Sequence, residues 1–233
     1  MTTDRFARLG ILMLDSQFPR IPGDVGNHLT WDFPVRYAVV PGATPAAIVE
    51  YDPAPFIDAF TEKGRELVAQ GCTGIATTCG FLALIRRELA ERLEVPVAAS
   101  ALEQSAQISA TLPAGQTLGI LTISATALTP DHLKVAGVPE NAVIQGMEGT
   151  AFAATILSDQ AELNISRAQD EIVFAAKALI DRAPETGAIL LECTNMVPYA
   201  RAVAAETGRP VYSIYSYLIW FHQSLLPKPF EQV

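Results

Sequence analysis

The sequence predicts an α/β protein of two similar lobes, each a short parallel sheet flanked by helices. Short apolar runs alternate with longer segments that carry apolar residues at helical spacing. Within the short runs, apolar and polar residues do not strictly alternate, which is typical of strands covered on both faces. The second half of the chain also repeats the pattern of the first. With 233 residues, the chain is long enough for one large domain or two small ones.

Eight short apolar runs are predicted to form strands. They are residues 9–14, 35–40, 74–78, 95–99, 118–123, 142–144, 188–191 and 211–214. The main predicted helices are residues 53–70, 81–93, 101–112 and 166–182. The first of these helices is expected to end at Gly71, because glycine favours the left-handed conformation of a C-cap. An apolar, aromatic segment at 216–226 is expected to close over the first lobe or to contact another subunit.

The chain contains an internal repeat. One apolar run ends at Cys79 and another at Cys193, and each cysteine is followed 17 residues later by a Pro-Val that opens the next run. LGILMLD at 9–15 likewise matches LGILTIS at 118–124. The offsets of 114 and 109 residues indicate two copies of a unit of roughly 110 residues. We therefore predict two pseudo-symmetric Rossmann-like lobes with the active site in the cleft between them: 1–113, completed by 214–233, and 114–213.

Composition and charge exclude several classes of protein. The formal net charge of −9 leaves no excess of lysine and arginine to bind nucleic-acid phosphates. The three cysteines have neither the density of a disulfide scaffold nor the spacing of a zinc site, so no metal is expected. Neither a signal-peptide core nor a membrane-spanning run is expected. The sequence therefore predicts a reduced, cytoplasmic protein without nucleic-acid or membrane partners.

Cys79 and Cys193 are the candidate catalytic residues. Both are predicted at the carboxyl end of a parallel strand, at the turn into a helix, where α/β proteins bind ligands. Backbone N–H groups at a helix N-terminus lower the pKa of a thiol. Two related lobes would aim the cysteines at one cleft from opposite sides. One thiolate could then remove a proton next to a carboxylate while the opposite thiol returns one. Cys72 has no counterpart in the second lobe and is expected to be structural.

Polar residues near the cysteines are predicted to bind the carboxylate of a small acid. Hydroxyl and carboxamide groups, together with helix-end N–H groups, bind a carboxylate without a full positive charge. The candidates beside the cysteines are Thr78, Thr194 and Asn195, and those after the first strand of each lobe are Asp15, Ser16 and Thr126. Glu192 is expected to point away from Cys193, because side chains alternate along a strand.

The two-copy layout, with TTCG in the first half and ECTN in the second, resembles the aspartate/glutamate racemase superfamily over nearly the whole chain. That superfamily includes amino-acid racemases, hydantoin racemase, maleate isomerase and arylmalonate decarboxylase. The resemblance implies chemistry without a cofactor at a carbon alpha to a carboxylate or carbonyl. It matches Cys79 and Cys193 to paired catalytic cysteines, Asp15 and Ser16 to an acid–hydroxyl pair, and Thr126 to a substrate-binding threonine.

The sequence also departs from the amino-acid racemases. Gly80, a further candidate for substrate binding, and Phe81 stand where those enzymes carry Asn-Thr after the first cysteine. Asn195 stands where glutamate racemases commonly carry histidine. The CTN triplet resembles maleate isomerase, whereas QFPRIPGDVGN at 17–27 and TTCGF resemble the dimethylsulfoniopropionate lyases of algae.

Segment 16–27 is expected to contact the cleft as a lid, with Arg20 a candidate partner of a second substrate carboxylate. The leading hypothesis is a cofactor-independent racemase or epimerase acting on an amino acid or related small acid, and a homo-oligomer. The alternatives are a lyase, decarboxylase or cis–trans isomerase of the same superfamily, and a non-catalytic binder of small acids.

Overall fold

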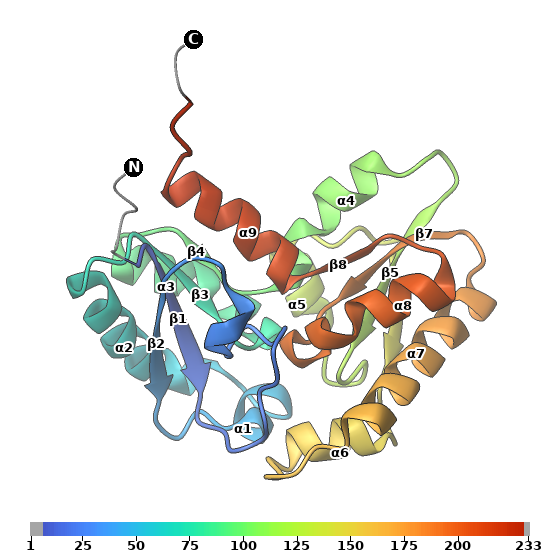
Figure 1. Ribbon diagram of the computed structural model, residues 1–233, viewed down its shortest axis with the longest axis horizontal. Helices are drawn as coiled ribbons and strands as arrows, with labels where there is room; N and C mark the ends of the chain where they lie inside the picture. The colour runs from blue at the N-terminus through green and yellow to red at the C-terminus, as the bar shows by residue number, and fades with distance from the viewer. Residues whose placement is uncertain (1–6, 231–233) are drawn as a thin grey trace.

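The computed structural model describes residues 7–230 and folds them into two four-stranded parallel sheets (Figure 1). The strand orders are β2-β1-β3-β4 and β6-β5-β7-β8. The strands are β1 (Leu9–Leu14), β2 (Val35–Val40), β3 (Gly74–Thr77), β4 (Val97–Ala98), β5 (Thr117–Thr122), β6 (Val143–Gly146), β7 (Thr186–Leu191) and β8 (Val211–Ser213). The predicted fold class is confirmed. Residues 1–6 and 231–233 of the predicted lobes lie outside the described residues.

Corresponding helices connect the strands of the two lobes. The first lobe contains α1 (Pro45–Val49), α2 (Ile57–Ala69), the 3-10 helix η3 (Gly80–Leu84) and α3 (Arg86–Leu93). Their counterparts are α6 (Ala151–Leu157), α7 (Ile165–Arg182), η5 (Thr194–Tyr199) and α8 (Ala200–Thr207). The other helices are η1 (His28–Thr30), η2 (Ala54–Phe56), η4 (Ala101–Gln104), α4 (Ser105–Thr111), α5 (Pro130–Val135) and α9 (Ile214–Leu225).

The repeated LGIL motif has a packing explanation in its glycine. A Cβ on Gly10 in β1 would lie 3.0 Å from Leu67 Cδ1 in α2. A Cβ on Gly119 in β5 would lie 2.5 Å from Leu179 Cδ2 in α7. In both lobes, glycine in the first strand therefore lets a leucine of the long helix pack directly against the sheet.

Two helices pack across the lobes. Helix α4, which follows the last strand of the first sheet, contacts β5 of the second (Figure 1). Helix α9, which follows the last strand of the second sheet, contacts β3 of the first. The α9 contact is close, because a Cβ on Gly74 would lie 2.6 Å from Leu225 Cδ1. This exchange brings the carboxyl ends of the two sheets together.

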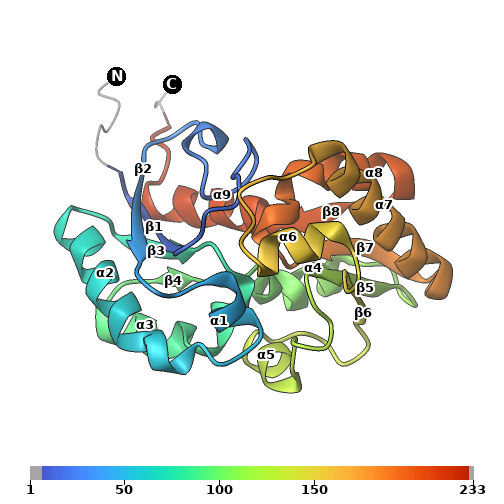
Figure 2. The same ribbon diagram turned by 90° about the horizontal axis from the view of Figure 1, so that it is seen from below.

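The short helices α1 and α6 also meet where the lobes join (Figure 2). Each follows the second strand of its lobe and begins at a threonine N-cap, Thr44 and Thr150 respectively, whose side chain accepts a backbone N–H. Within residues 7–230, no helix is both long and apolar enough to cross a membrane.

Candidate active site

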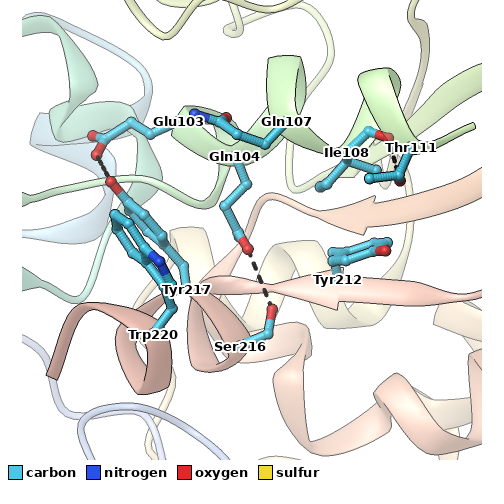
Figure 3. A pocket seen from close by; sticks show the side chains of 9 residues that line it. All are labelled: Glu103, Gln104, Gln107, Ile108, Thr111, Tyr212, Ser216, Tyr217 and Trp220. Atoms are coloured by element: carbon cyan, nitrogen blue, oxygen red, sulfur yellow. Dashed lines mark hydrogen bonds between the residues drawn. The ribbon is translucent and has the colours of Figure 1, made fainter. Parts of the chain in front are cut away.

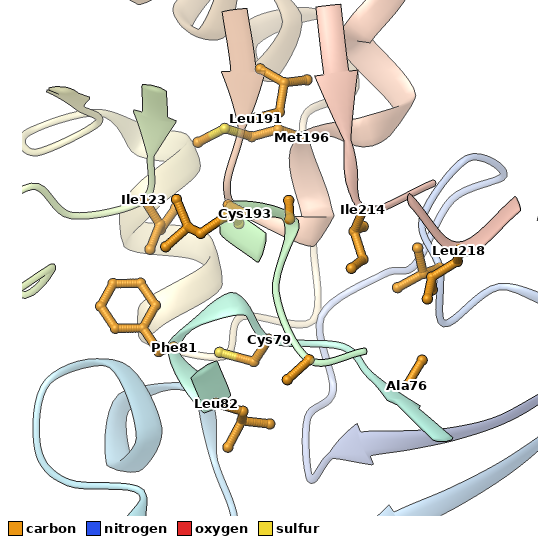
Figure 4. Packing of buried hydrophobic residues seen from close by; sticks show 14 of the residues in the cluster. Ala76, Cys79, Phe81, Leu82, Ile123, Leu191, Cys193, Met196, Ile214 and Leu218 are labelled. Atoms are coloured by element: carbon orange, nitrogen blue, oxygen red, sulfur yellow. The ribbon is translucent and has the colours of Figure 1, made fainter. Parts of the chain in front are cut away.

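Cys79 and Cys193 line one small cavity between the lobes, and Figure 4 shows both among the packed buried side chains of this region. Each cysteine is only 7% exposed. The free space is about 20 Å³, room for about one water molecule. The other lining residues are Leu14, Phe18, Pro45, Val49, Thr78, Phe81, Ile123, Ile156, Glu192, Thr194 and Asn195. The structure is therefore closed, and a substrate enters only when the lobes or a covering loop move apart.

Cys79 follows β3 and is the N-cap of η3. The turn is held by Thr77, whose Oγ1 donates to the carbonyl oxygen of Ala99 at 2.8 Å. The hydroxyl of Thr78 accepts the backbone N–H of Leu14 at 3.1 Å, which ties the end of β3 to the end of β1. These bonds fix the backbone directly before the cysteine, which lines the cavity.

Cys193 is the N-cap of η5 in the corresponding place of the second lobe. Its Sγ lies 3.6 Å from Asn195 Oδ1. The hydroxyl of Thr194 donates to the backbone carbonyl oxygen of Thr78 at 2.7 Å. This bond joins the two cysteine-bearing turns directly, so Thr78, Thr194 and Asn195 are brought together with both cysteines, as is Gly80 beside Cys79.

Burial dominates the electrostatics of both thiols. It raises the pKa of Cys79 to about 12, with a smaller upward effect from the Glu192 carboxylate. Burial and Glu192 also raise the pKa of Cys193 well above 9.0. The backbone N–H groups of Phe81 and Asn195 lower the pKa of Cys79 and Cys193 respectively, as expected of helix ends, but burial outweighs them. Both cysteines are therefore neutral thiols at neutral pH.

Glu192 points into the cavity, so the prediction that it points away is wrong. Strand β7 ends at Leu191, and the backbone turns before Cys193, so regular alternation does not extend to this residue. The side chain is 1% exposed, and burial raises its pKa to about 7. Sequence reasoning missed a buried acid in the site. The signal that could have found it is a charged residue inside an otherwise apolar run, AILLEC, directly before a candidate catalytic cysteine.

The loop between β1 and β2 covers one side of the cavity, and Phe18 from this loop lines it. Arg20 does not line the cavity. Its guanidinium donates to Asp24 Oδ1 at 3.0 Å and to Ser16 Oγ at 3.2 Å. Asp24, which the sequence did not single out, is buried, and its Oδ2 accepts the Asn195 amide N–H at 2.6 Å. The loop is thus anchored on the second lobe through Asp24.

Asp15 and Thr126 lie outside the cavity, and both are exposed. Asp15 Oδ2 accepts the backbone N–H of Gly42 at 2.9 Å. Glu148 Oε1 accepts the backbone N–H of Thr126 at 3.0 Å and lies 3.2 Å from Ser124 Oγ. In this closed conformation both predicted substrate-binding residues instead hold the turns that follow β1 and β5.

A wider groove of about 390 Å³ lies between α4 and α9 (Figure 3). Its acid, Glu103, is already partnered, because Oε2 accepts the hydroxyl of Tyr217 at 3.0 Å and Oε1 accepts the backbone N–H of Ser100 at 3.1 Å. The groove is larger, but its acid is already hydrogen-bonded. We therefore place the candidate active site at the smaller cavity, which both cysteines line. Among residues 7–230, no cluster of histidine, cysteine and carboxylate side chains could hold a metal ion.

Comparison with known proteins identifies relatives along nearly the whole chain. A dimethylsulfoniopropionate lyase of Durusdinium sp. clade D is 30% identical over 216 residues, which cover 89% of this chain and 71% of that protein. Dimethylsulfoniopropionate lyase 5 of Emiliania huxleyi is 29% identical over 95% of this chain, which spans only 46% of that protein. No family model matches the sequence.

Solved structures show the same fold at low sequence identity. Allantoin racemase of Pseudomonas fluorescens superposes with a TM-score of 0.61 at 17% identity, over 97% of this chain and 99% of that one. Arylmalonate decarboxylase superposes with a TM-score of 0.61 at 13% identity, over 96% of this chain and 94% of that one. At these identities the likeness concerns the fold.

Proposed function

The chain belongs to the dimethylsulfoniopropionate lyase family, within the aspartate/glutamate racemase superfamily, and from that premise we propose that it is a carbon–sulfur lyase. Its proposed substrate is dimethylsulfoniopropionate, a small carboxylate with a dimethylsulfonium group on its β carbon. Of the activities expected from the sequence, elimination is thus favoured over racemisation. The observation that carries the proposal is the pair of buried cysteines facing one closed cavity.

The proposed reaction is a β-elimination. A base removes a proton from the carbon alpha to the carboxylate, and the C–H electron pair forms the carbon–carbon double bond. The carbon–sulfur bond breaks with its electron pair on sulfur, so dimethyl sulfide leaves as a neutral molecule and acrylate remains. The proton stays on the base until it passes to water. Because the leaving group carries no negative charge, the reaction needs one base and no acid at sulfur.

A cysteine thiolate is the proposed base, and the zwitterionic substrate helps to form it. The cysteines are neutral because burial disfavours the thiolate. A bound sulfonium places a positive charge in that space and lowers the pKa of the nearby thiols. Meanwhile, the closed cavity excludes water that would protonate the carbanion.

Groups at the ends of β3 and β7 are proposed to bind the substrate carboxylate. The backbone N–H groups of Phe81 and Asn195 lie next to the cysteines, where they lower the thiol pKa. The hydroxyl oxygen of Thr78 accepts a backbone N–H, which leaves its proton to donate. Such neutral donors strengthen as negative charge moves from the α carbon onto the carboxylate in the transition state.

The test is to incubate the purified protein with dimethylsulfoniopropionate and to measure dimethyl sulfide and acrylate, which should form in equal amounts. A double Cys79→Ser, Cys193→Ser variant should lose this activity. Cys72→Ala is the matched control, because Cys72 is also buried and free but does not line the cavity. Wild-type protein that forms neither product would contradict the proposal, as would a fully active double variant.

Racemisation is the second candidate, favoured by the corresponding places of the two cysteines in the lobes. A two-base racemase needs one thiol on each side of the α carbon. Single enantiomers of small 2-substituted acids incubated in deuterated water test this candidate. Loss of optical rotation with deuterium at the α carbon, and no new product, would support racemisation in place of elimination.

A further inference from the structure

Glu192 is the one buried acid among the residues that line the cysteine cavity, and one of its two carboxylate oxygens makes no hydrogen bond. Oε2 accepts the hydroxyl of Thr122 at 2.8 Å, and the backbone N–H of Ile123 lies near the carboxylate and lowers its pKa. Within residues 7–230, Oε1 has no hydrogen-bond partner. A buried carboxylate oxygen without a partner is costly, so its retention needs a reason other than stability.

The first lobe shows that the fold does not require an acid at this place. Thr78 precedes Cys79 as Glu192 precedes Cys193, and Leu14 corresponds to Ile123 in the repeated first strands. In the first lobe, the Leu14 N–H bonds to the threonine hydroxyl. In the second lobe, the Ile123 N–H lies near the Glu192 carboxylate, where it lowers a pKa that burial raises. In the first lobe a threonine serves the corresponding N–H without a charge, so the longer, charged side chain of glutamate is left for another role.

Gly80 indicates where the free oxygen lies. A Cβ on Gly80 would overlap Oε1 of Glu192 and lie 3.0 Å from Ser100 Oγ. The acid from the second lobe thus occupies the space beside the N-terminus of η3, next to Cys79 in the first lobe. The glycine that distinguishes this chain from the amino-acid racemases makes room for the glutamate.

The charge of Glu192 opposes the proposed thiol chemistry unless something compensates it. As an anion, it raises the pKa of both Cys79 and Cys193. Arg20 does lower the pKa of Cys79, but by less than burial and Glu192 raise it. The positive charge of Arg20 is also already paired with Asp24. A positively charged ligand would pair with Glu192 and remove its unfavourable effect on the thiols in one step.

The other lining side chains restrict the kind of cation. Much of the lining is apolar, including the aromatic rings of Phe18 and Phe81 and the aliphatic side chains of Val49 and Ile156. A primary ammonium carries three N–H donors and would leave some of them unpaired there. A methylated onium group has no such donors, fits apolar surfaces, and is attracted to aromatic faces.

We propose that Glu192 is the counter-charge that selects a substrate with a methylated sulfonium or ammonium group. This role rests on one part of the proposed function, namely that the substrate's carboxylate end binds in the same cavity. It does not require that the substrate is cleaved there. Glu192 acts on binding and specificity, while proton removal belongs to a cysteine.

Two unreactive acids of the same shape test the role. In 3-(trimethylammonio)propanoate the β carbon carries a quaternary ammonium, and in 4,4-dimethylpentanoate the corresponding group is a neutral tert-butyl. Their Kd values are measured by calorimetry at pH 8 with the wild type, Glu192→Gln and Glu192→Thr. Threonine is the residue that the first lobe uses. Glu103→Gln is the control, because it removes another buried carboxylate that lies outside the cavity.

The wild type should bind the cationic acid roughly tenfold or more tightly than the neutral one, since the neutral acid leaves a buried carboxylate without a counter-charge. Both Glu192 variants should reduce the ratio to within about twofold, whereas Glu103→Gln should keep the wild-type ratio. An unchanged ratio in the Glu192 variants would overturn the proposal, even if their turnover fell, because Glu192 would then not select the cationic group.

Product formation separates this result from the lyase proposal. Wild-type protein that prefers the cationic acid but forms no acrylate from dimethylsulfoniopropionate would contradict the lyase and support Glu192 as the counter-charge. Wild-type protein that forms acrylate without preferring the cationic acid would support the lyase and overturn the role of Glu192.

Discussion

The two lobes use the same scaffold and differ at the residue before each cysteine. In the first lobe, Thr78 closes a backbone hydrogen bond and adds no charge. In the second, Glu192 lies near the corresponding backbone N–H and brings an unpartnered oxygen into the site. The comparison teaches that the repeat preserves the positions of the thiols while the neighbouring residues make the site asymmetric. A zwitterionic substrate has two different ends, which is what an asymmetric site can distinguish.

The lobes differ also in the connection after their first strand. In the second lobe, helix α5 lies between β5 and β6. In the first, an irregular loop reaches to the other lobe, where Asp159 Oδ1 accepts the backbone N–H groups of Gln17 at 2.6 Å and Phe18 at 3.2 Å. The loop of the first lobe thus covers the cavity and is held by the second lobe, and four experiments test these differences.

The largest expected effect is on turnover. Burial and Glu192 raise the pKa of both thiols most, but Arg20 lowers the pKa of Cys79 and Asp24 raises that of Cys193, which favours Cys79 as the base. With one base needed, Cys79→Ser should lower kcat for dimethylsulfoniopropionate about a thousandfold, and Cys193→Ser much less. Steady-state acrylate formation measures both. Equal losses would contradict a single base and indicate a two-thiol reaction.

The next effect is on stability and depends on pH. The pKa of Glu192 is about 7 in the folded protein and near 4.5 in the unfolded chain, so the wild type loses stability as pH rises between these values. Glu192→Gln lacks this loss, and its free energy of unfolding should be higher by about 3 kcal/mol at pH 8. Near pH 4 the two proteins should be alike. Urea unfolding at both pH values measures this, and a less stable variant at pH 8 would contradict it.

A smaller effect is expected at Gly80. An added Cβ would overlap the Glu192 carboxylate, so Gly80→Ala should lower the free energy of unfolding by about 2 kcal/mol. Combining it with Glu192→Thr, which shortens the opposing side chain, should recover much of that loss. Urea unfolding of the single and double variants measures the coupling. Additive losses would place the two side chains out of contact.

The smallest effect concerns the cover over the cavity. Asp159→Ala removes the acceptor of two loop N–H groups and should cost about 1 kcal/mol. Backbone hydrogen exchange should quicken at Gln17 and Phe18, and not in β5. Asp159→Asn is the control, because it keeps an acceptor oxygen and tolerates the positive φ of 50° at this residue. Unchanged exchange in Asp159→Ala would show that the loop is held elsewhere.

Much of the fold could be predicted because its signals are local and repeated. Alternating apolar runs and helical segments located every strand, although β4 is only Val97–Ala98, shorter than the predicted 95–99. Strand ends are less well defined in sequence, because they depend on which neighbouring backbone remains available for pairing. The LGIL repeat predicted two equivalent first strands, and the glycine in each has the same close contact with a helix.

The site could be predicted only in part. That the two cysteines and the residues beside them lie close together could be predicted because they are at corresponding strand ends; their catalytic role stays a prediction. Arg20 was expected to meet the substrate, but it pairs with Asp24 inside the loop, and no sequence pattern indicated that partner. Asp15 and Thr126 hold turns in the closed structure because backbone N–H groups of nearby residues reach them or the acid beside them.

The sequence by itself determined the two-lobe α/β fold and the equivalence of Cys79 and Cys193, since both follow from apolar spacing within one repeat. Only the tertiary structure decided that Glu192 points inward, that Thr194 joins the two cysteine turns, and that the loop of Asp24 covers the cavity. These contacts join residues far apart in the chain. Their partners are chosen by how the two sheets meet, which local spacing does not encode.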